Sequence, residues 1–278
     1  MAHHPGRLFG NQRRVLLAAI LCLGVATTPV ISQQVDLEEV MCTLCHFEQG
    51  DAFATSIHYK RGLLLCNDCH GGLPFEADTE IAKAPGTGFI GRPARGDIAA
   101  LCGSCHSGPA QFFVQGPHHE WHNEANPTCI SCHSNHAVVD ATLDLIDESC
   151  SKCHEIGTPA LAWGTDLAAA LRGAKGDLDH TATILDSLIA ADRSLRHAMP
   201  LLETATSSLR EADPRSHALD QALMNKTFDL FRQDLTAVEQ AIADHAETRE
   251  RRRWIVYPVW GFIVVNVLLM WVKRRQLK

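Results

Sequence analysis

The chain has 278 residues, of which 46% are hydrophobic, and its formal net charge is −7. At roughly 150 residues per domain this length suggests about two domains, and the hydrophobic content excludes a disordered or collagen-like chain. Lys and Arg number 25 against 32 for Asp and Glu, so nucleic acid is not an expected partner. The 11 cysteines and 16 histidines suggest metal or haem chemistry instead.

Residues 1–32 have the layout of a secretory signal peptide. The first 14 residues carry three arginines and no acid, and an apolar run to about residue 30 follows them. Cleavage after Ser32 would start the mature chain near Gln33. The alternative is an uncleaved anchor, but the run is short for a membrane span and contains Pro29.

Ten cysteines form five pairs at CxxC spacing, and a histidine follows each pair directly. Two thiols at this spacing can form thioethers with one haem while the next imidazole binds its iron. Zinc ribbons and thioredoxin-like sites do not require that histidine. A disulfide framework is excluded because the motifs use every cysteine outside the signal peptide. The motifs predict five haem c groups, each with a proximal histidine: Cys42-Thr-Leu-Cys45-His46, Cys66-Asn-Asp-Cys69-His70, Cys102-Gly-Ser-Cys105-His106, Cys129-Ile-Ser-Cys132-His133 and Cys150-Ser-Lys-Cys153-His154.

The motifs define a pentahaem domain over residues 33–160. The motifs themselves occupy residues 42–154, or about 23 residues per haem, which is too small a segment to bury much surface of its own, so we expect the porphyrins to form its core. Haem of this kind is attached outside the cytoplasm. The sequence therefore predicts residues 33–253 in the periplasm and residues 273–278 in the cytoplasm.

An internal repeat nominates two distal iron ligands. In the halves that begin at Cys42 and Cys102, a phenylalanine follows the first motif histidine by seven residues, and a second histidine follows it by twelve. These second histidines are His58 and His118, and their repeated position predicts that both are sixth ligands. Surface histidines in loops are the alternative.

Other histidines are candidates for the remaining distal positions. His136 follows the fourth motif closely, and His119 and His122 stand beside His118. The fifth motif has no histidine at the repeated spacing, so its sixth ligand must come from elsewhere or be missing. His180 is the nearest histidine after that motif and is a further candidate; His197, His217 and His245 are weaker ones.

Residues 161–253 show leucines at helical spacing and predict a helical bundle or stalk. Asp213 and Pro214 predict a new helix that would run for about 40 residues, or about 60 Å, toward the membrane. Residues 254–272 carry no charge and have aromatic residues near both ends, which predicts one transmembrane helix. The expected fold is therefore mostly α-helical with extensive loops, comprising a haem-packed domain, a helical stalk and one C-terminal span.

The motif series, Ser56-Ile57-His58 and the CHxxH form at His133 to His136 resemble multihaem cytochromes c related to class III cytochromes and the tetrahaem quinol dehydrogenases. A haem domain before long C-terminal helices also resembles the hydroxylamine oxidoreductase group. This resemblance extends over about residues 40–250. The anchor lies at the other end from that of the quinol dehydrogenases, so quinol oxidation does not follow from it.

Three functions are compatible with this pattern. The first is a membrane-anchored periplasmic electron carrier that relays electrons between a membrane redox complex or the quinol pool and periplasmic partners, and that is not itself an enzyme. The second is an oxidoreductase acting on a small nitrogen or sulfur compound at a five-coordinate haem, placed at the fifth motif. The third is a subunit of a larger membrane complex. Residues 33–160 have a net charge of −11, which favours a basic redox partner.

Overall fold

The computed structural model describes residues 34–119 and 125–276 of the chain. The expected signal peptide and His122 lie outside these residues. All regular structure in the described part is helical. Its elements are η1 (Leu37–Glu39), α2 (Met41–Cys45), α3 (Phe47–Ala54), α4 (Ile57–Lys60), α5 (Cys66–His70), α6 (Thr79–Ala82), η2 (Pro85–Thr87), η3 (Arg95–Asp97), α7 (Ile98–Gly103), α8 (Ser107–Phe113), η4 (Pro117–His119), α9 (Cys129–His133), α10 (Asp144–Cys150), α11 (Pro159–Ala191), η5 (Arg193–Ala198), α12 (Met199–Arg210), α13 (Ala212–Ser216) and α14 (Gln221–Gln276).

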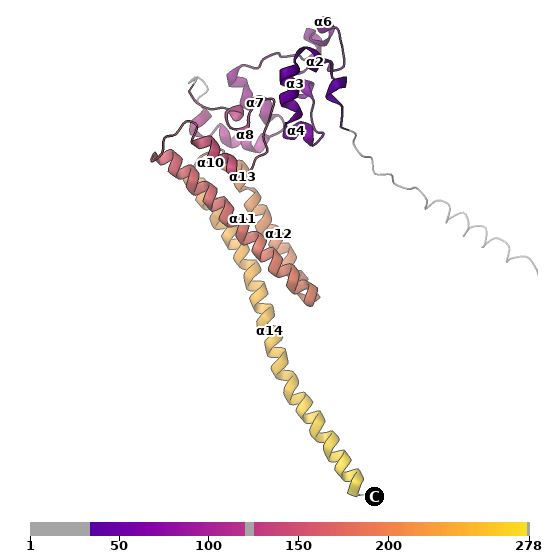
Figure 1. Ribbon diagram of the computed structural model, residues 1–278. Coiled ribbons are helices and arrows are strands. Elements are labelled where there is room, and N and C mark those ends of the chain that lie inside the picture. The colour runs from indigo at the N-terminus through magenta and orange to yellow at the C-terminus, as the bar shows by residue number, and fades with distance from the viewer. Residues whose placement is uncertain (1–33, 120–124, 277–278) are drawn as a thin grey trace, which may run out of the picture.

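The short helices and the long helices form two distinct parts (Figure 1). Helices α2 to α10 gather at one end of the molecule, where α2 and α3 lie away from the stalk and α10 packs against α11. Helices α11, α12 and α14 form an elongated bundle, and α14 continues beyond it to the C-terminal end. The predicted fold class, a mostly α-helical chain with a long C-terminal apolar helix, is confirmed.

The part that carries the CxxCH motifs has little apolar core of its own. Within residues 34–158, the buried hydrophobic side chains of the described residues are Val40, Phe53 and Ile98. Many large apolar side chains are exposed there instead. They are Leu44, Phe47, Leu63, Leu73, Phe75, Ile81, Ile90, Val114, Ile130, Val139 and Ile156. This segment therefore offers apolar surface for large apolar groups to cover.

The helical bundle has a conventional core in two clusters. Pro159 at the first helical position and the Thr158 hydroxyl, which accepts a hydrogen bond from the Leu161 N–H at 3.4 Å, start α11. One cluster lies nearer the motif-bearing part and the other nearer the far end, and each uses side chains three and four positions apart. The buried members are Leu167, Leu171, Ala174, Ala205, Ala212, Met224, Phe228, Phe231 and Leu235 in the first, and Leu185, Leu195, Ala198 and Val238 in the second.

The predicted start of the last long helix is wrong. Asp213 and Pro214 lie inside the five-residue α13, and the long helix begins only at Gln221. The chain turns between them because Leu219 adopts a left-handed φ of 50°. The Asp220 carboxylate then accepts a hydrogen bond from the Leu223 N–H at 3.0 Å, which caps the new helix.

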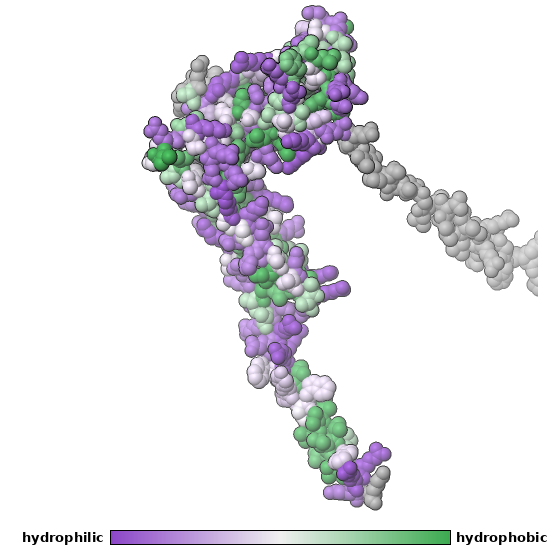
Figure 2. Space-filling model, in the orientation of Figure 1, coloured by the Kyte–Doolittle hydropathy of each residue, from purple (hydrophilic) through white to green (hydrophobic). Residues whose placement is uncertain are grey.

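Helix α14 leaves the bundle and extends alone as an apolar rod. It contains the one helix segment of the described chain that is long and apolar enough to cross a membrane, with a mean hydropathy of 2.1 over 18 residues and none of that window buried. Figure 2 shows this segment as a hydrophobic band near the C-terminal end, bordered by hydrophilic residues. The Asn266 amide donates to the Phe262 carbonyl at 2.8 Å, so this polar group is satisfied within the helix.

Candidate functional site

Each CxxCH motif is folded as a helical turn. The second and fourth motifs are the whole of α5 and α9, and the other three overlap the end of a helix. In those three, the histidine N–H donates to the carbonyl of the first cysteine: His46 to Cys42 at 3.0 Å, His106 to Cys102 at 2.9 Å and His154 to Cys150 at 3.0 Å. A helical turn places positions one, four and five on neighbouring faces. Both thiols and the imidazole of one motif can therefore reach one porphyrin.

The internal repeat is also a structural repeat. Helices α2 to α5 recur in the same order as α7, α8, η4 and α9. The residue after the second motif of each half has the same left-handed backbone, with φ 68° at Gly71 and 64° at Ser134. The cap before that motif recurs as well, since the N–H groups of Leu65 and Thr128 are bonded by the side chains of Asp68 and Ser131. We call residues 42–70 module 1 and residues 102–133 module 2.

Four of the motif histidines face a second histidine across a gap. In each pair the two imidazole rings are nearly parallel, with interplanar angles between 13° and 26°. A metal–imidazole bond is about 2 Å long, so two imidazoles on opposite sides of one metal have ring centres about 6 Å apart. The observed centroid distances are 6.0 Å for His70 and His136, 5.9 Å for His106 and His58, 6.3 Å for His133 and His217, and 6.3 Å for His154 and His118.

Burial favours the neutral, ligating form of these rings. Loss of hydration lowers the pKa of His58, His118, His133 and His136 below the usual 6.5, and the facing histidine lowers it further in each case. A backbone carbonyl near Nδ1 also orients two of the rings. The Nδ1 atom of His70 lies 2.7 Å from the Gly91 carbonyl oxygen, and that of His217 lies 3.1 Å from the Asp213 carbonyl oxygen. Such bonds leave Nε2 free to bind a metal.

The five motifs follow one another in space in sequence order. In each of the four pairs of successive motifs, a thiol of one motif is close enough to a thiol of the other to perturb its pKa. For example, burial and then the neighbouring Cys42 thiol raise the pKa of Cys66 to about 11. The neighbouring thiols are Cys42 with Cys66, Cys69 with Cys102, Cys102 with Cys129, and Cys132 with Cys150.

The remaining candidate histidines are not paired with a motif histidine among the described residues. His119 lies edge-on to Phe113, with ring centroids 6.2 Å apart. His180 is exposed on α11, along the bundle. His46 of the first motif is exposed as well, and no described histidine faces it. The fifth motif, which has no histidine at the repeated spacing, faces His118.

His217 is one of several stalk histidines in the sequence, yet it faces His133 from 84 positions away. The only signal of this contact in the sequence is a pair of glycines in module 2. Gly108 and Gly116 take the places of Glu48 and Ser56 in module 1. Their close contacts with the segment around His217 could not be read without the fold.

The site fits haem c groups. Each motif supplies two thiols and an imidazole, exposed apolar side chains surround the motifs, and four further imidazoles lie opposite. Three buried polar atoms adjoin the motifs and have no hydrogen-bond partner in the described chain: Asn67 Oδ1, Thr128 Oγ1 and Ser149 Oγ. Cys42, Cys45, Cys66, Cys69, Cys102, Cys105, Cys129, Cys132, Cys150 and Cys153 are all free thiols in this structure.

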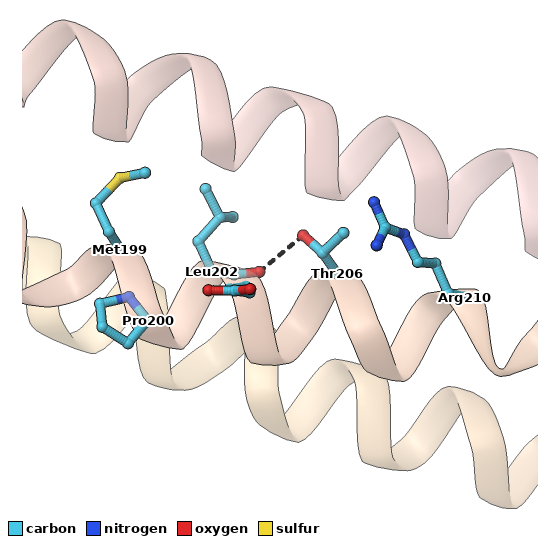
Figure 3. Close-up of a pocket in the computed structure, with 6 residues that line it drawn as sticks. Met199, Pro200, Leu202, Thr206 and Arg210 are labelled. Carbon is cyan, nitrogen blue, oxygen red and sulfur yellow. Dashed lines mark hydrogen bonds between the residues drawn. The ribbon is translucent and has the colours of Figure 1, made fainter.

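A surface pocket on the bundle is separate from this site. It lies on α12 and is lined by Met199, Pro200, Leu202, Glu203, Thr206 and Arg210. Figure 3 shows several of these side chains in a row along the helix, with the Thr206 hydroxyl donating to the Leu202 carbonyl at 2.8 Å. The lining contains no cysteine or histidine. Met199, a possible iron ligand by residue type, therefore lies in a pocket without haem-binding groups.

Comparison with known proteins gives two matches. Residues 51–134 match the family model of cytochrome c7 and related cytochrome c, and this range contains the second, third and fourth motifs. The chain is also similar to the C-type polyheme cytochrome OmcC of Geobacter sulfurreducens, with 28% identity over 123 aligned residues. The match covers 36% of this chain. It spans only 15% of the length of that relative. No solved structure matches the chain.

Proposed function

We propose that this multihaem c-type cytochrome, with its cytochrome c7-like domain, is a membrane-anchored extracytoplasmic electron carrier that holds five covalent haems. The observation that carries the proposal is the set of four nearly parallel histidine pairs at 5.9 to 6.3 Å. A haem iron with two imidazole ligands exchanges electrons without offering a position to substrate. The cysteines would bind the haems covalently, and the facing histidines would occupy the remaining coordination position of each iron.

The order of the motifs supports a linear path for electrons. Neighbouring thiols link each motif to the next, so the haems that these cysteines would hold would follow one another in sequence order. The first motif, on α2, would form the end away from the stalk, and the fifth, after α10, would form the end beside α11 (Figure 1). Electrons would therefore enter and leave at opposite ends of the haem domain.

The length of the stalk favours a protein partner over direct contact with quinol. Between Gln221 and Trp254, α14 rises about 50 Å before the apolar span begins. His217, which faces the fourth motif, lies four residues before the start of this helix. A quinol in the bilayer would lie far from that motif. The partner we propose is a redox protein, or a protein complex, that reaches the height of the haem domain.

The proposed orientation rests on where haem c is attached. Residues 1–32 would direct the chain across the inner membrane and be removed. Residues 33–160 would carry the haems in the periplasm, 161–253 would form the stalk, and 254–272 would anchor it. Residues 273–278 would remain in the cytoplasm.

A second candidate function is favoured by His46. This proximal histidine is exposed and no described histidine faces it, so a small nitrogen or sulfur compound could bind at the haem of the first motif. The chain would then be an oxidoreductase with four bis-histidine haems supplying electrons to the first. This places the substrate at the first motif rather than the fifth.

A turnover assay separates the two candidates. Full-length protein in detergent is reduced anaerobically with an excess of chemically reduced viologen and mixed with nitrite, hydroxylamine or sulfite. The carrier is expected to exchange electrons with a basic cytochrome and to consume none of the three compounds. Continuous consumption that is lost in His46→Ala and kept in His119→Ala would contradict the carrier and support the oxidoreductase.

A further inference from the structure

We infer that His217, a residue of the stalk, is the sixth ligand of the iron at the fourth motif, and that this bond fastens the haem domain to the membrane helix. The inference rests on the proposed function, because it requires a haem at Cys129 and Cys132. The rings of His133 and His217 have centroids 6.3 Å apart and an interplanar angle of 13°, the smallest of the four pairs. The other three pairs lie within residues 58–154.

The backbone around His217 holds the ring in a ligating orientation. Its Nδ1 atom lies 3.1 Å from the Asp213 carbonyl oxygen, which also accepts a hydrogen bond from the Ser216 hydroxyl at 2.7 Å. The left-handed Leu219 ends this turn, and Asp220 caps α14. The free Nε2 therefore points away from its own backbone before any iron binds.

Two glycines let the haem domain approach this turn closely. A Cβ atom on Gly116 would lie 2.8 Å from the Ala218 carbonyl oxygen, and one on Gly108 would lie 3.2 Å from the Pro214 Cβ. Module 1 has Ser56 and Glu48 at the equivalent positions, so the glycines occur only in the module that meets the stalk. The packing and the ring pair thus locate the same contact by independent observations.

The bond would connect two parts that are far apart in the sequence. His133 and His217 are 84 positions apart in the sequence. The chain between them includes all of α11 and α12, and α14 begins four residues after His217. A covalent haem at one end and a metal–imidazole bond at the other would close this loop, and metal binding would then stabilise the fold of the junction. Residues 212–220, which lie in the stalk by sequence position, would supply a ligand to the haem domain.

The test uses full-length His217→Ala in detergent. The haem content should stay at the wild-type level, because the thioethers are untouched. One additional iron per chain should become high-spin in the electron paramagnetic resonance spectrum and should bind carbon monoxide after reduction. Free imidazole should restore the low-spin signal, and the circular dichroism spectrum should keep its wild-type helix content, which a loss of folding would not allow. His197→Ala is the matched control, because His197 is exposed in η5 at the far end of the bundle.

The outcomes separate this inference from the proposed function. An unchanged spin state in His217→Ala would overturn the inference while leaving the carrier intact. A wild-type protein without haem at the fourth motif, shown by a Cys129→Ser, Cys132→Ser variant whose mass falls only by the two substitutions and not by a haem, would overturn both.

A second variant tests the packing without removing a ligand. Gly116→Ala places a methyl group against the Ala218 carbonyl, so the turn must shift and part of the fourth iron should become high-spin. The control is Gly86→Ala, whose added Cβ meets nothing within 4 Å. Hydrogen exchange at residues 212–220 should rise in Gly116→Ala and not in the control. Equal exchange and spin state in the two variants would contradict the close contact.

Discussion

The imidazole rings of His118 and His154 lie 6.3 Å apart and within 19° of parallel. The same relationship joins His58 to His106, so the distal histidine of each module faces the first motif that follows the module. The fifth motif therefore takes the place of a third module's first motif.

His118→Ala should open the iron of the fifth motif. We expect one additional high-spin iron per chain and unchanged haem content, because the cysteines of that motif remain. His119→Ala is the control, since His119 contacts Phe113 rather than a motif histidine. The spin state is read by electron paramagnetic resonance of the oxidised protein. Equal spectra for the two variants would show that His118 is not the ligand.

Replacing both Cys150 and Cys153 by serine should destabilise the haem domain but not the bundle. The motif-bearing part has few buried apolar side chains, so each haem would contribute a large share of its core. Loss of one haem should lower the melting temperature followed by haem absorbance at the other sites. The bundle, whose two clusters contain no motif residue, should keep its helical melting transition in circular dichroism. A single melting temperature that is unchanged by the substitutions would contradict this division.

Phe231→Ala should destabilise the bundle but not the haem domain. Phe231 is 1% exposed in the first core cluster of the bundle, and removal of such a side chain costs about 3–5 kcal/mol of unfolding free energy. The haem spectrum should not change. Leu230→Ala, at an exposed position on the same helix, should change stability by no more than about 0.5 kcal/mol. Denaturant unfolding followed by circular dichroism measures both values.

Asp192 should make the end of the bundle sensitive to acid. The hydrogen bond from the Ser194 N–H at 2.9 Å, and secondarily the Ser194 hydroxyl and nearby His245, lower the pKa of this carboxyl below its usual 3.8. A carboxyl with a lower pKa in the folded state stabilises the fold above its ordinary pKa and loses this effect as the pH falls through the lowered value. Asp192→Asn should therefore lower the melting temperature at pH 7 more than at pH 3. Asp186→Asn, at an exposed position of α11, should show no such difference.

Electron transfer to a basic partner should slow as salt rises. Residues 33–160 contain 17 acidic and 6 basic residues, so a basic redox protein should be attracted to the haem domain. Stopped-flow rates with a basic cytochrome should fall steeply between low and physiological ionic strength, while rates with a neutral small oxidant should stay nearly constant. Equal salt dependence for the two would contradict electrostatic docking.

The sequence predicts the local chemistry of the site well, because each CxxCH motif is complete within one helical turn. It also nominates His58 and His118, since a duplication repeats their position. It does not predict which iron each serves, because the module rule joins residues from different modules. The role of His217 is harder still to predict from the sequence. It depends on a turn at Leu219 and on the close contacts of two glycines, which only the fold shows.

The fold was predictable in class and not in detail. Leucine spacing predicts the bundle, and the uncharged run at residues 254–272 predicts the apolar part of α14. The start of α14 was misplaced because Asp213 and Pro214 are a plausible helix start by themselves. The packing of α13 on α8, with Gly108 against Pro214, keeps them in a separate short helix.

The central claim is that all five motifs carry haem and that histidine pairs close four of the irons. Intact mass and electron paramagnetic resonance of one sample of the oxidised full-length protein test it most directly. The account predicts the mass of five haems per chain and low-spin signals from at least four irons. Fewer than five haems, or high-spin signals from two or more irons, would contradict it.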